Sequence, residues 1–126
     1  MVTSVKLFDM ELGFEERPWG RFYVLDDMHT HKVKRIEVNP ASRISYQYHM
    51  QREEFWTIVS GKARVTIEGT DKILSAGDTI HIPKEALHRI ENISDVSCIF
   101  IEVQLGTYFG EDDIIRIQDD YNRENE

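Results

Sequence analysis

Two histidines, a glutamine and a glutamate lie in two short segments at spacings that suit a metal-binding pocket. His49, Gln51 and Glu54 fall in the first segment, and His88 follows Pro83 in the second. Neutral imidazole nitrogen and carboxylate oxygen suit zinc, manganese, cobalt, nickel or iron, whereas a glutamine carbonyl oxygen is a poorer ligand. Three or four protein ligands leave a position open for a substrate oxygen. We therefore expect one divalent metal ion held by His49, Glu54 and His88, with Gln51 as a weak fourth ligand.

The alternative is that His49 and His88 are core histidines with satisfied hydrogen bonds. For either residue alone this is the more common situation. The presence of both motifs in one short chain reverses that preference.

Other polar side chains share strand faces with apolar residues, which is costly unless they are paired or bind something. Gln47 is in phase with His49, and Gln51 joins that face if the strand stays extended. Lys34 shares a face with Ile36 and Val38, and Glu102 alternates with Ile101 and Val103. Cations beside a metal pocket in an acidic protein suit a phosphate or carboxylate group.

Short β-type runs, separated by turns about every ten residues, must position these side chains. The sequence predicts strands over 21–25, 32–38, 44–48, 54–60, 63–67, 72–74, 78–82, 88–92, 98–104 and 114–118. No long stretch has the 3.6-residue period of an amphipathic helix. We expect an all-β jelly roll or small barrel over residues 17–123, preceded by an arm or edge segment over 1–16.

The remaining features set limits on partners and surroundings. The chain has 126 residues, which is one domain of ordinary size, and its net charge of −8 argues against nucleic acid and anionic membranes as partners. We expect no secretory signal, because the first residues contain no apolar core of the kind such signals have, and no apolar run is long enough to span a membrane. The single cysteine, Cys98, is expected to be a buried apolar residue, in keeping with a cytoplasmic protein. The acidic run 111–113 is expected to be a solvated turn, or at most a weak cation site.

The two segments resemble the two motifs of the cupin superfamily. The first has Glu54 followed by Gly61, and the second has Pro83, His88 and Asn92. Beyond the superfamily, the chain is similar to the isomerase domain of type II phosphomannose isomerases, which usually forms the C-terminal part of a bifunctional mannose-1-phosphate guanylyltransferase. The similarity is carried by residues 17–20, 34–36, 45–49, 52–56, 88–92 and 101–114. The last of these stretches is long and unusual, so it is the most specific.

The resemblance implies a double-stranded β-helix, the cupin form of the jelly roll. It assigns metal binding to His49, Glu54 and His88, and a catalytic or phosphate-binding role to Arg52. The family has histidine where this chain has Gln51 and Phe55, and usually glycine where it has Glu85. We expect no guanylyl transfer, because the chain contains no glycine-rich nucleotide loop.

The expected activity is a metal-dependent aldose–ketose isomerisation of a sugar phosphate, mannose 6-phosphate to fructose 6-phosphate. The metal would bind the substrate oxygens at C1 and C2 and stabilise an enediolate. Either Glu54 or Glu102 would move the proton between C2 and C1, and the sequence leaves that choice open. Lys34 and Arg52 would bind the phosphate, and Gln47 would contact the substrate.

Two rival functions remain open at this point. Gln51 favours a non-catalytic sugar- or ligand-binding cupin, which would hold little metal but be stabilised by its ligand. The other rival is a different small-molecule cupin enzyme, such as an iron dioxygenase or a nucleotide-sugar epimerase, for which Tyr46, Tyr48 and Trp56 could supply an aromatic surface. For any of these functions we expect a homodimer that pairs through edge strands.

Overall fold

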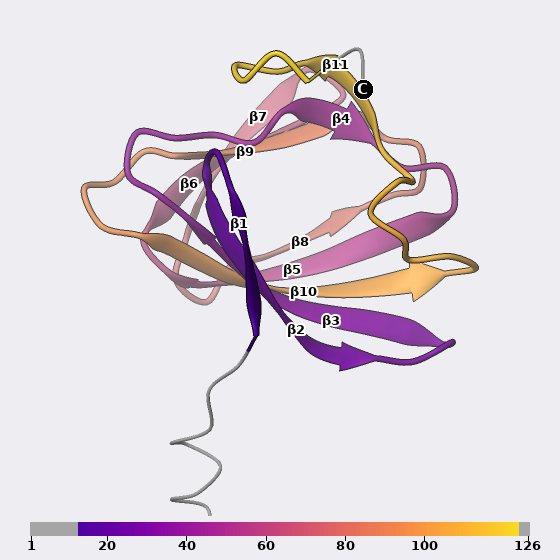
Figure 1. Ribbon diagram of the computed structural model, residues 1–126. Helices are drawn as coiled ribbons and strands as arrows, with labels where there is room; N and C mark the ends of the chain where they lie inside the picture. Colours follow the sequence, from indigo (N-terminus) through magenta and orange to yellow (C-terminus); the bar gives the residue numbers. More distant parts are fainter. Residues whose placement is uncertain (1–12, 124–126) are drawn as a thin grey trace, which may run out of the picture.

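The computed structural model describes residues 13–123, and all of the regular structure in that range is β. The strands are β1 (Phe14–Arg17), β2 (Gly20–Asp27), β3 (His31–Val38), β4 (Tyr46–Tyr48), β5 (Arg52–Ser60), β6 (Lys62–Ile67), β7 (Thr70–Ser75), β8 (Thr79–Ile82), β9 (His88–Asn92), β10 (Cys98–Gly106) and β11 (Ile115–Gln118). They form two antiparallel sheets that face each other (Figure 1). The expected all-β jelly roll is confirmed.

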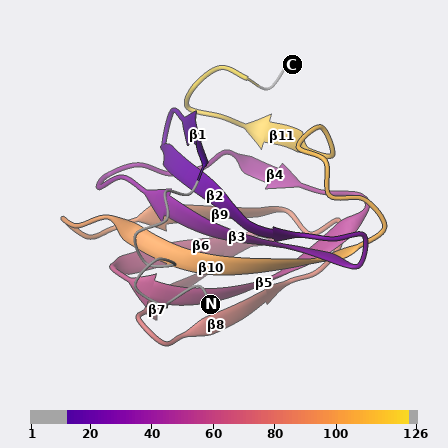
Figure 2. The ribbon, with the colours of Figure 1, turned by 60° about the horizontal axis from the view of Figure 1, so that its bottom comes forward.

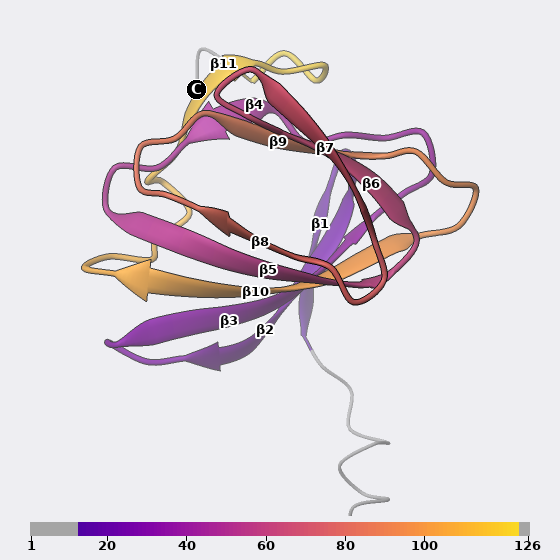
Figure 3. The same ribbon diagram turned by 180° about the vertical axis from the view of Figure 1, so that it is seen from behind.

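The two sheets differ in their strand order but end on matching sides. One sheet has the order β1-β2-β3-β10-β5-β8 and the other β11-β4-β9-β6-β7. Figure 2 shows the edge strands β1 and β11 at one side of the sandwich, and Figure 3 shows β8 and β7 at the other. In both sheets some neighbouring strands are not consecutive in the chain, so residues that are distant in sequence lie side by side.

Each predicted strand corresponds to one of β2–β11, but the first strand was not predicted separately. β1 falls inside the expected arm and pairs with β2 at the free edge of the six-stranded sheet; the rest of that arm, residues 1–12, lies outside the described residues. β4 begins at Tyr46, two residues later than expected, and ends at Tyr48 as predicted. The strand does not stay extended beyond Tyr48, and this decides which of the following side chains reach the interior.

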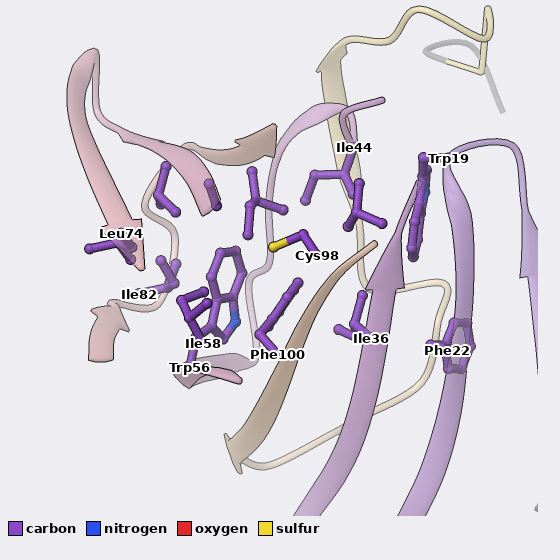
Figure 4. Packing of buried hydrophobic residues seen from close by; sticks show 14 residues of the cluster. Trp19, Phe22, Ile36, Ile44, Trp56, Ile58, Leu74, Ile82, Cys98 and Phe100 are labelled. Atoms are coloured by element: carbon purple, nitrogen blue, oxygen red, sulfur yellow. The ribbon is translucent and has the colours of Figure 1, made fainter. Parts of the chain in front are cut away.

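The apolar core fills one part of the space between the sheets. Its largest fully buried members include Trp56, Ile58 and Phe100, and Cys98 is buried among them as expected (Figure 4). Burial raises the pKa of the Cys98 thiol to about 11, so this residue behaves as a small apolar side chain. Alternate residues of β5 and β10 are buried, as the period of two requires.

The inward faces change from apolar to polar along the strands. On β5, Ile58 and Trp56 give way to Glu54, while on antiparallel β10, Phe100 gives way to Glu102. The register places Glu102 beside Lys34 of β3. One end of the sandwich interior is therefore apolar and holds the fold together, and the other end carries buried charge.

Candidate active site

The structure brings His49, Glu54 and His88 together in the polar end of the interior. Each offers one ligand atom, and these atoms all lie within 4.8 Å of one another. The two imidazole rings have centroids 5.1 Å apart, and the three residues are no more than 4% exposed. Glu54 comes from β5, His88 begins β9 and His49 directly follows β4. This group could hold a metal ion.

The hydrogen bonds of the two histidines occupy Nδ1 and leave the other ring nitrogen, Nε2, available for a ligand. His49 Nδ1 lies 2.7 Å from the carbonyl oxygen of Asp113, and His88 Nδ1 lies 2.9 Å from that of Ala86. A carbonyl oxygen only accepts, so both Nδ1 atoms carry the proton and both Nε2 atoms keep a lone pair. His88 Nε2 is buried without a hydrogen-bond partner among residues 13–123.

The residues present fit a metal ion, because two hydrogen-bond acceptors face each other with no proton between them. His49 Nε2 lies 3.3 Å from Glu54 Oε2, and both atoms present lone pairs when the imidazole is neutral. Burial lowers the pKa of His49 to about 4 and also lowers the pKa of His88. Both rings are therefore neutral near pH 7, and a cation among the three groups would satisfy their lone pairs.

The glutamine that lies beside His49 is Gln47 and not Gln51. Gln47 pairs with His88 across β4 and β9, and its amide nitrogen lies 3.5 Å from His49 Nε2. The two atoms of a terminal amide are exchangeable by a flip, so the carbonyl oxygen can occupy this position. The Gln51 residue is exposed. The chain bends after β4, so the alternation that would have carried Gln51 inward is lost.

Two buried carboxylates share a tryptophan. Trp56 Nε1 donates to Glu54 Oε1 at 2.9 Å and to Glu102 Oε1 at 3.1 Å. Gln104 Nε2 donates to the other oxygen of Glu102 at 2.6 Å, and Arg52 Nε to the other oxygen of Glu54 at 2.8 Å. The two acids are thus held on either side of one indole.

These two acids have pKa values that are pushed apart. Burial, and then the negative charge of Glu54, raise the pKa of Glu102 to about 8. Burial also opposes ionisation of Glu54, but the charges of His49 and Arg52 outweigh it and hold the pKa of Glu54 below its usual range. Arg52 is the charge that persists at neutral pH. Glu54 is therefore ionised at pH 7 while Glu102 is mostly protonated, a division of roles typical of acid–base sites.

Two buried cations lie beside these acids. Lys34 is 3% exposed, sits 4.1 Å from the centre of the Phe22 ring and forms an ion pair with Glu111. Arg52 is 6% exposed, and its Nη1 has no hydrogen-bond partner within the described part of the chain. Lys32 Nζ is 3.9 Å from Glu111. Glu111 lies in an exposed turn, as the sequence predicts, and its carboxylate is also the counter-ion of Lys34.

One cavity of about 70 Å³ joins these groups. Its walls include Gln47, His49, Arg52, Glu54 and Glu102. All of the expected catalytic and substrate-binding residues therefore lie on or beside a single space, with Lys34 also on its wall. Among the expected metal ligands, Gln51 is the one that the structure leaves outside.

Comparison with known proteins decides the family. Residues 13–119 match the family model described as Mannose-6-phosphate isomerase C-terminal. The chain belongs to this family. The mannose-1-phosphate guanylyltransferase of Salmonella montevideo is 44% identical over 107 residues, which are 85% of this chain but 23% of that protein. This member of the mannose-6-phosphate isomerase C-terminal family thus spans about a quarter of the relative it matches.

Solved structures confirm the cupin fold of this family member. An RmlC-like cupin from Shewanella frigidimarina has a TM-score of 0.70 at 20% identity, covering 81% of this chain and 88% of that one. The oxalate decarboxylase of Lactobacillus farciminis, in a formate complex, has a TM-score of 0.73 at 26% identity and covers 84% of this chain and 33% of its own. In the part of the chain that is described, no helix is long and apolar enough to cross a membrane.

Proposed function

We propose that this domain is a metal-dependent aldose–ketose isomerase that interconverts mannose 6-phosphate and fructose 6-phosphate. The observation that carries the proposal is one cavity lined by His49 and Glu54, two of the three members of the metal-binding group, and by Glu102, whose protonation state is opposite to that of Glu54. The family description supports the substrate. The guanylyltransferase activity named for the relative is not proposed, because the match covers under a quarter of its length.

His49, Glu54, His88 and the amide oxygen of Gln47 would hold the ion. A divalent cation there would supply positive charge to polarise the oxygens on C1 and C2 of the sugar. Zinc, manganese, cobalt, nickel and iron all accept this mixture of nitrogen and oxygen ligands. Trp56 fixes Glu54 from the side opposite Arg52, so the carboxylate keeps its direction toward the two imidazoles.

Glu102 is the group that we propose to carry the proton between C2 and C1. It lines the cavity but is not part of the ligand group, whereas Glu54 is engaged by Arg52 and the histidines. A carboxyl with a pKa of about 8 lies close to the working pH, where a group can both accept and release a proton. Gln104 and Trp56 hold its two oxygens in place.

Lys34 and Arg52 would bind the phosphate. Lys34 is fully covered by the fold and its charge is balanced by Glu111, and Arg52 offers the free Nη1 described above. A phosphate dianion would interact with both cations more strongly than a single carboxylate does. The proposal therefore requires the Glu111 side chain to leave Lys34 when substrate enters.

The test is turnover of mannose 6-phosphate by the isolated domain after loading with zinc, manganese, cobalt, nickel or iron. We expect turnover with at least one metal, loss of it in His88→Ala, and wild-type turnover in the matched control His81→Ala. His81 is half-exposed and bonded to Glu53 on the surface. Metal binding without turnover by any loaded form would overturn the proposal, and stabilisation by the sugar phosphate would then indicate the ligand-binding alternative.

A further inference from the structure

The acidic run 111–113 lies in the connection between β10 and β11, and its three side chains have different contacts. Glu111 pairs with Lys34, and Asp112 accepts a hydrogen bond from the Tyr108 hydroxyl at 2.5 Å. Asp113 is 9% exposed and faces inward. The proposed function makes no use of Asp113, although Asp113 is the most buried of the three.

Asp113 binds three consecutive residues of the turn that carries the first histidine. Its Oδ1 accepts from Met50 N at 3.0 Å and its Oδ2 accepts from Gln51 N at 3.0 Å. Its backbone carbonyl accepts from His49 Nδ1 at 2.7 Å. One residue therefore satisfies two backbone amides between β4 and β5, which have no strand partner, and also orients an imidazole.

The turn over residues 49–51 also contacts the start of the β10–β11 connection. Thr107 N donates to Gln51 O at 3.0 Å, and the backbone of Gly106 approaches so closely that a Cβ there would lie 2.1 Å from Gln51 O. The 49–51 turn is thus attached to both ends of the β10–β11 connection. A shift of Asp113 would move the backbone that carries His49.

The two histidines differ in what fixes them. His88 donates to Ala86, two residues away in the same loop, whereas His49 donates to a residue 64 positions later. Arg52 Nη2 lies 3.4 Å from His49 Nε2 and can only donate to it. The orientation and tautomer of His49 therefore depend on a distant segment, and those of His88 do not.

We infer that Asp113 is a positioning residue, which holds His49 in the tautomer and direction that present Nε2 to the metal group. Outer hydrogen bonds of this kind raise metal affinity by about 10- to 100-fold. The inference rests on the metal-binding part of the proposed function, but it requires neither turnover nor a particular sugar.

The experiment reads the histidine tautomers of the metal-free domain at pH 7 by long-range ¹⁵N–¹H NMR, and zinc affinity by competition with a chelator. In the wild type we expect both histidines to carry the proton on Nδ1. Asp113→Ala keeps the backbone carbonyl that accepts from His49 but removes the two side-chain bonds to Met50 N and Gln51 N that hold the turn in place. We therefore expect His49 to move off the carbonyl and become a mixture of tautomers while His88 stays unchanged, and zinc affinity to fall about 10-fold or more. The matched control Asp112→Ala, at an exposed neighbour, should leave both readings at wild-type values.

Asp113→Asn provides a milder variant should the alanine variant fail to fold. Its amide keeps one acceptor but places NH₂ against the second backbone amide, so an intermediate change at His49 is expected. A folded variant with a wild-type His49 tautomer and zinc affinity within twofold of wild type would overturn the inference. A protein that shows the expected Asp113 effects but isomerises no sugar phosphate would instead overturn the proposed function.

Discussion

Gln47 and Gln51 show how a single turn separates two chemically identical side chains. Both follow the same phase as His49 if the chain stays extended. β4 ends at Tyr48, so only Gln47 keeps the inward direction, while Gln51 becomes exposed and contributes its backbone amide to Asp113. Position 51, where the family is expected to have a histidine, therefore lies outside the pocket of this chain.

At this scale we predict that Gln47→Ala weakens zinc binding about 10-fold or more, as loss of a group that ligates or orients would. Gln51→Ala is the matched control and should bind zinc as wild type does, because its side chain points to solvent. Competition with a chelating dye measures both. Equal losses in the two variants would contradict the assignment of Gln47.

A second residue-scale prediction concerns acid stability. Burial lowers the pKa of His49 from 6.5 to about 4, so the folded state disfavours the charged ring. The stability from the neutral ring is complete above pH 6.5 and is lost as the pH falls through about 4. In the metal-free domain this amounts to roughly 3 kcal/mol of the free energy of unfolding, at about 1.4 kcal/mol per pKa unit.

Urea denaturation at a series of pH values tests this expectation. His49→Gln should show a shallower loss of stability than wild type between pH 6.5 and 4, because the variant has no ring to protonate. A variant whose stability follows the wild-type pH dependence would contradict it.

At the scale of elements, the β10–β11 connection closes the site. The cavity of about 70 Å³ is far smaller than the roughly 300 Å³ or more of typical ligand pockets. Glu111 from this connection occupies the counter-ion position at Lys34, and the charge of Lys34 holds the pKa of Glu111 below its usual range, against the opposing effect of partial desolvation. A sugar phosphate could enter only if this connection moves and the carboxylate is replaced.

We therefore predict that Glu111→Gln binds inorganic phosphate several-fold more tightly than wild type, since removal of one competing ion pair corresponds to about 1 kcal/mol. Isothermal titration calorimetry measures the affinity. Asp112→Asn, which changes an adjacent carboxylate bonded to Tyr108, should have no effect. Weaker phosphate binding by Glu111→Gln would show that Glu111 supports the anion site instead of competing for it.

At the scale of the whole molecule, β1 is an edge strand of the six-stranded sheet and pairs only with β2 within residues 13–123. Phe14 on that strand is 49% exposed, and Val24, Leu25 and Met28 are exposed near the end of β2. An edge strand with exposed apolar side chains is suited to pairing with a second copy. We expect two chains to associate there by twofold symmetry.

The corresponding prediction is a homodimer in size-exclusion chromatography with light scattering, and a monomer for Phe14→Glu. Ile73→Glu is the matched control, because Ile73 is also 49% exposed but lies on β7 in the other sheet. A monomeric wild-type protein, or a Phe14→Glu variant that remains dimeric, would contradict this interface.

The sequence by itself determined the all-β fold and the phase of several polar side chains. Alternation of period two puts Glu54 in phase with Trp56, and Lys34 in phase with Ile36, before any coordinates are known. Local spacing was enough to select His49 and His88. Local pattern decides direction within a strand because successive side chains must point to opposite faces.

The tertiary structure decided what happens where strands end and distant segments meet. It brought Gln47 instead of Gln51 beside His49 and paired Glu111 with Lys34. It also formed the hydrogen bond between His49 and Asp113, which are 64 positions apart. It also gave Glu54 a lowered and Glu102 a raised pKa, because both depend on burial and on neighbouring charge. Such contacts arise from the crossovers between two sheets, and no local period in the sequence encodes which loops those crossovers bring together.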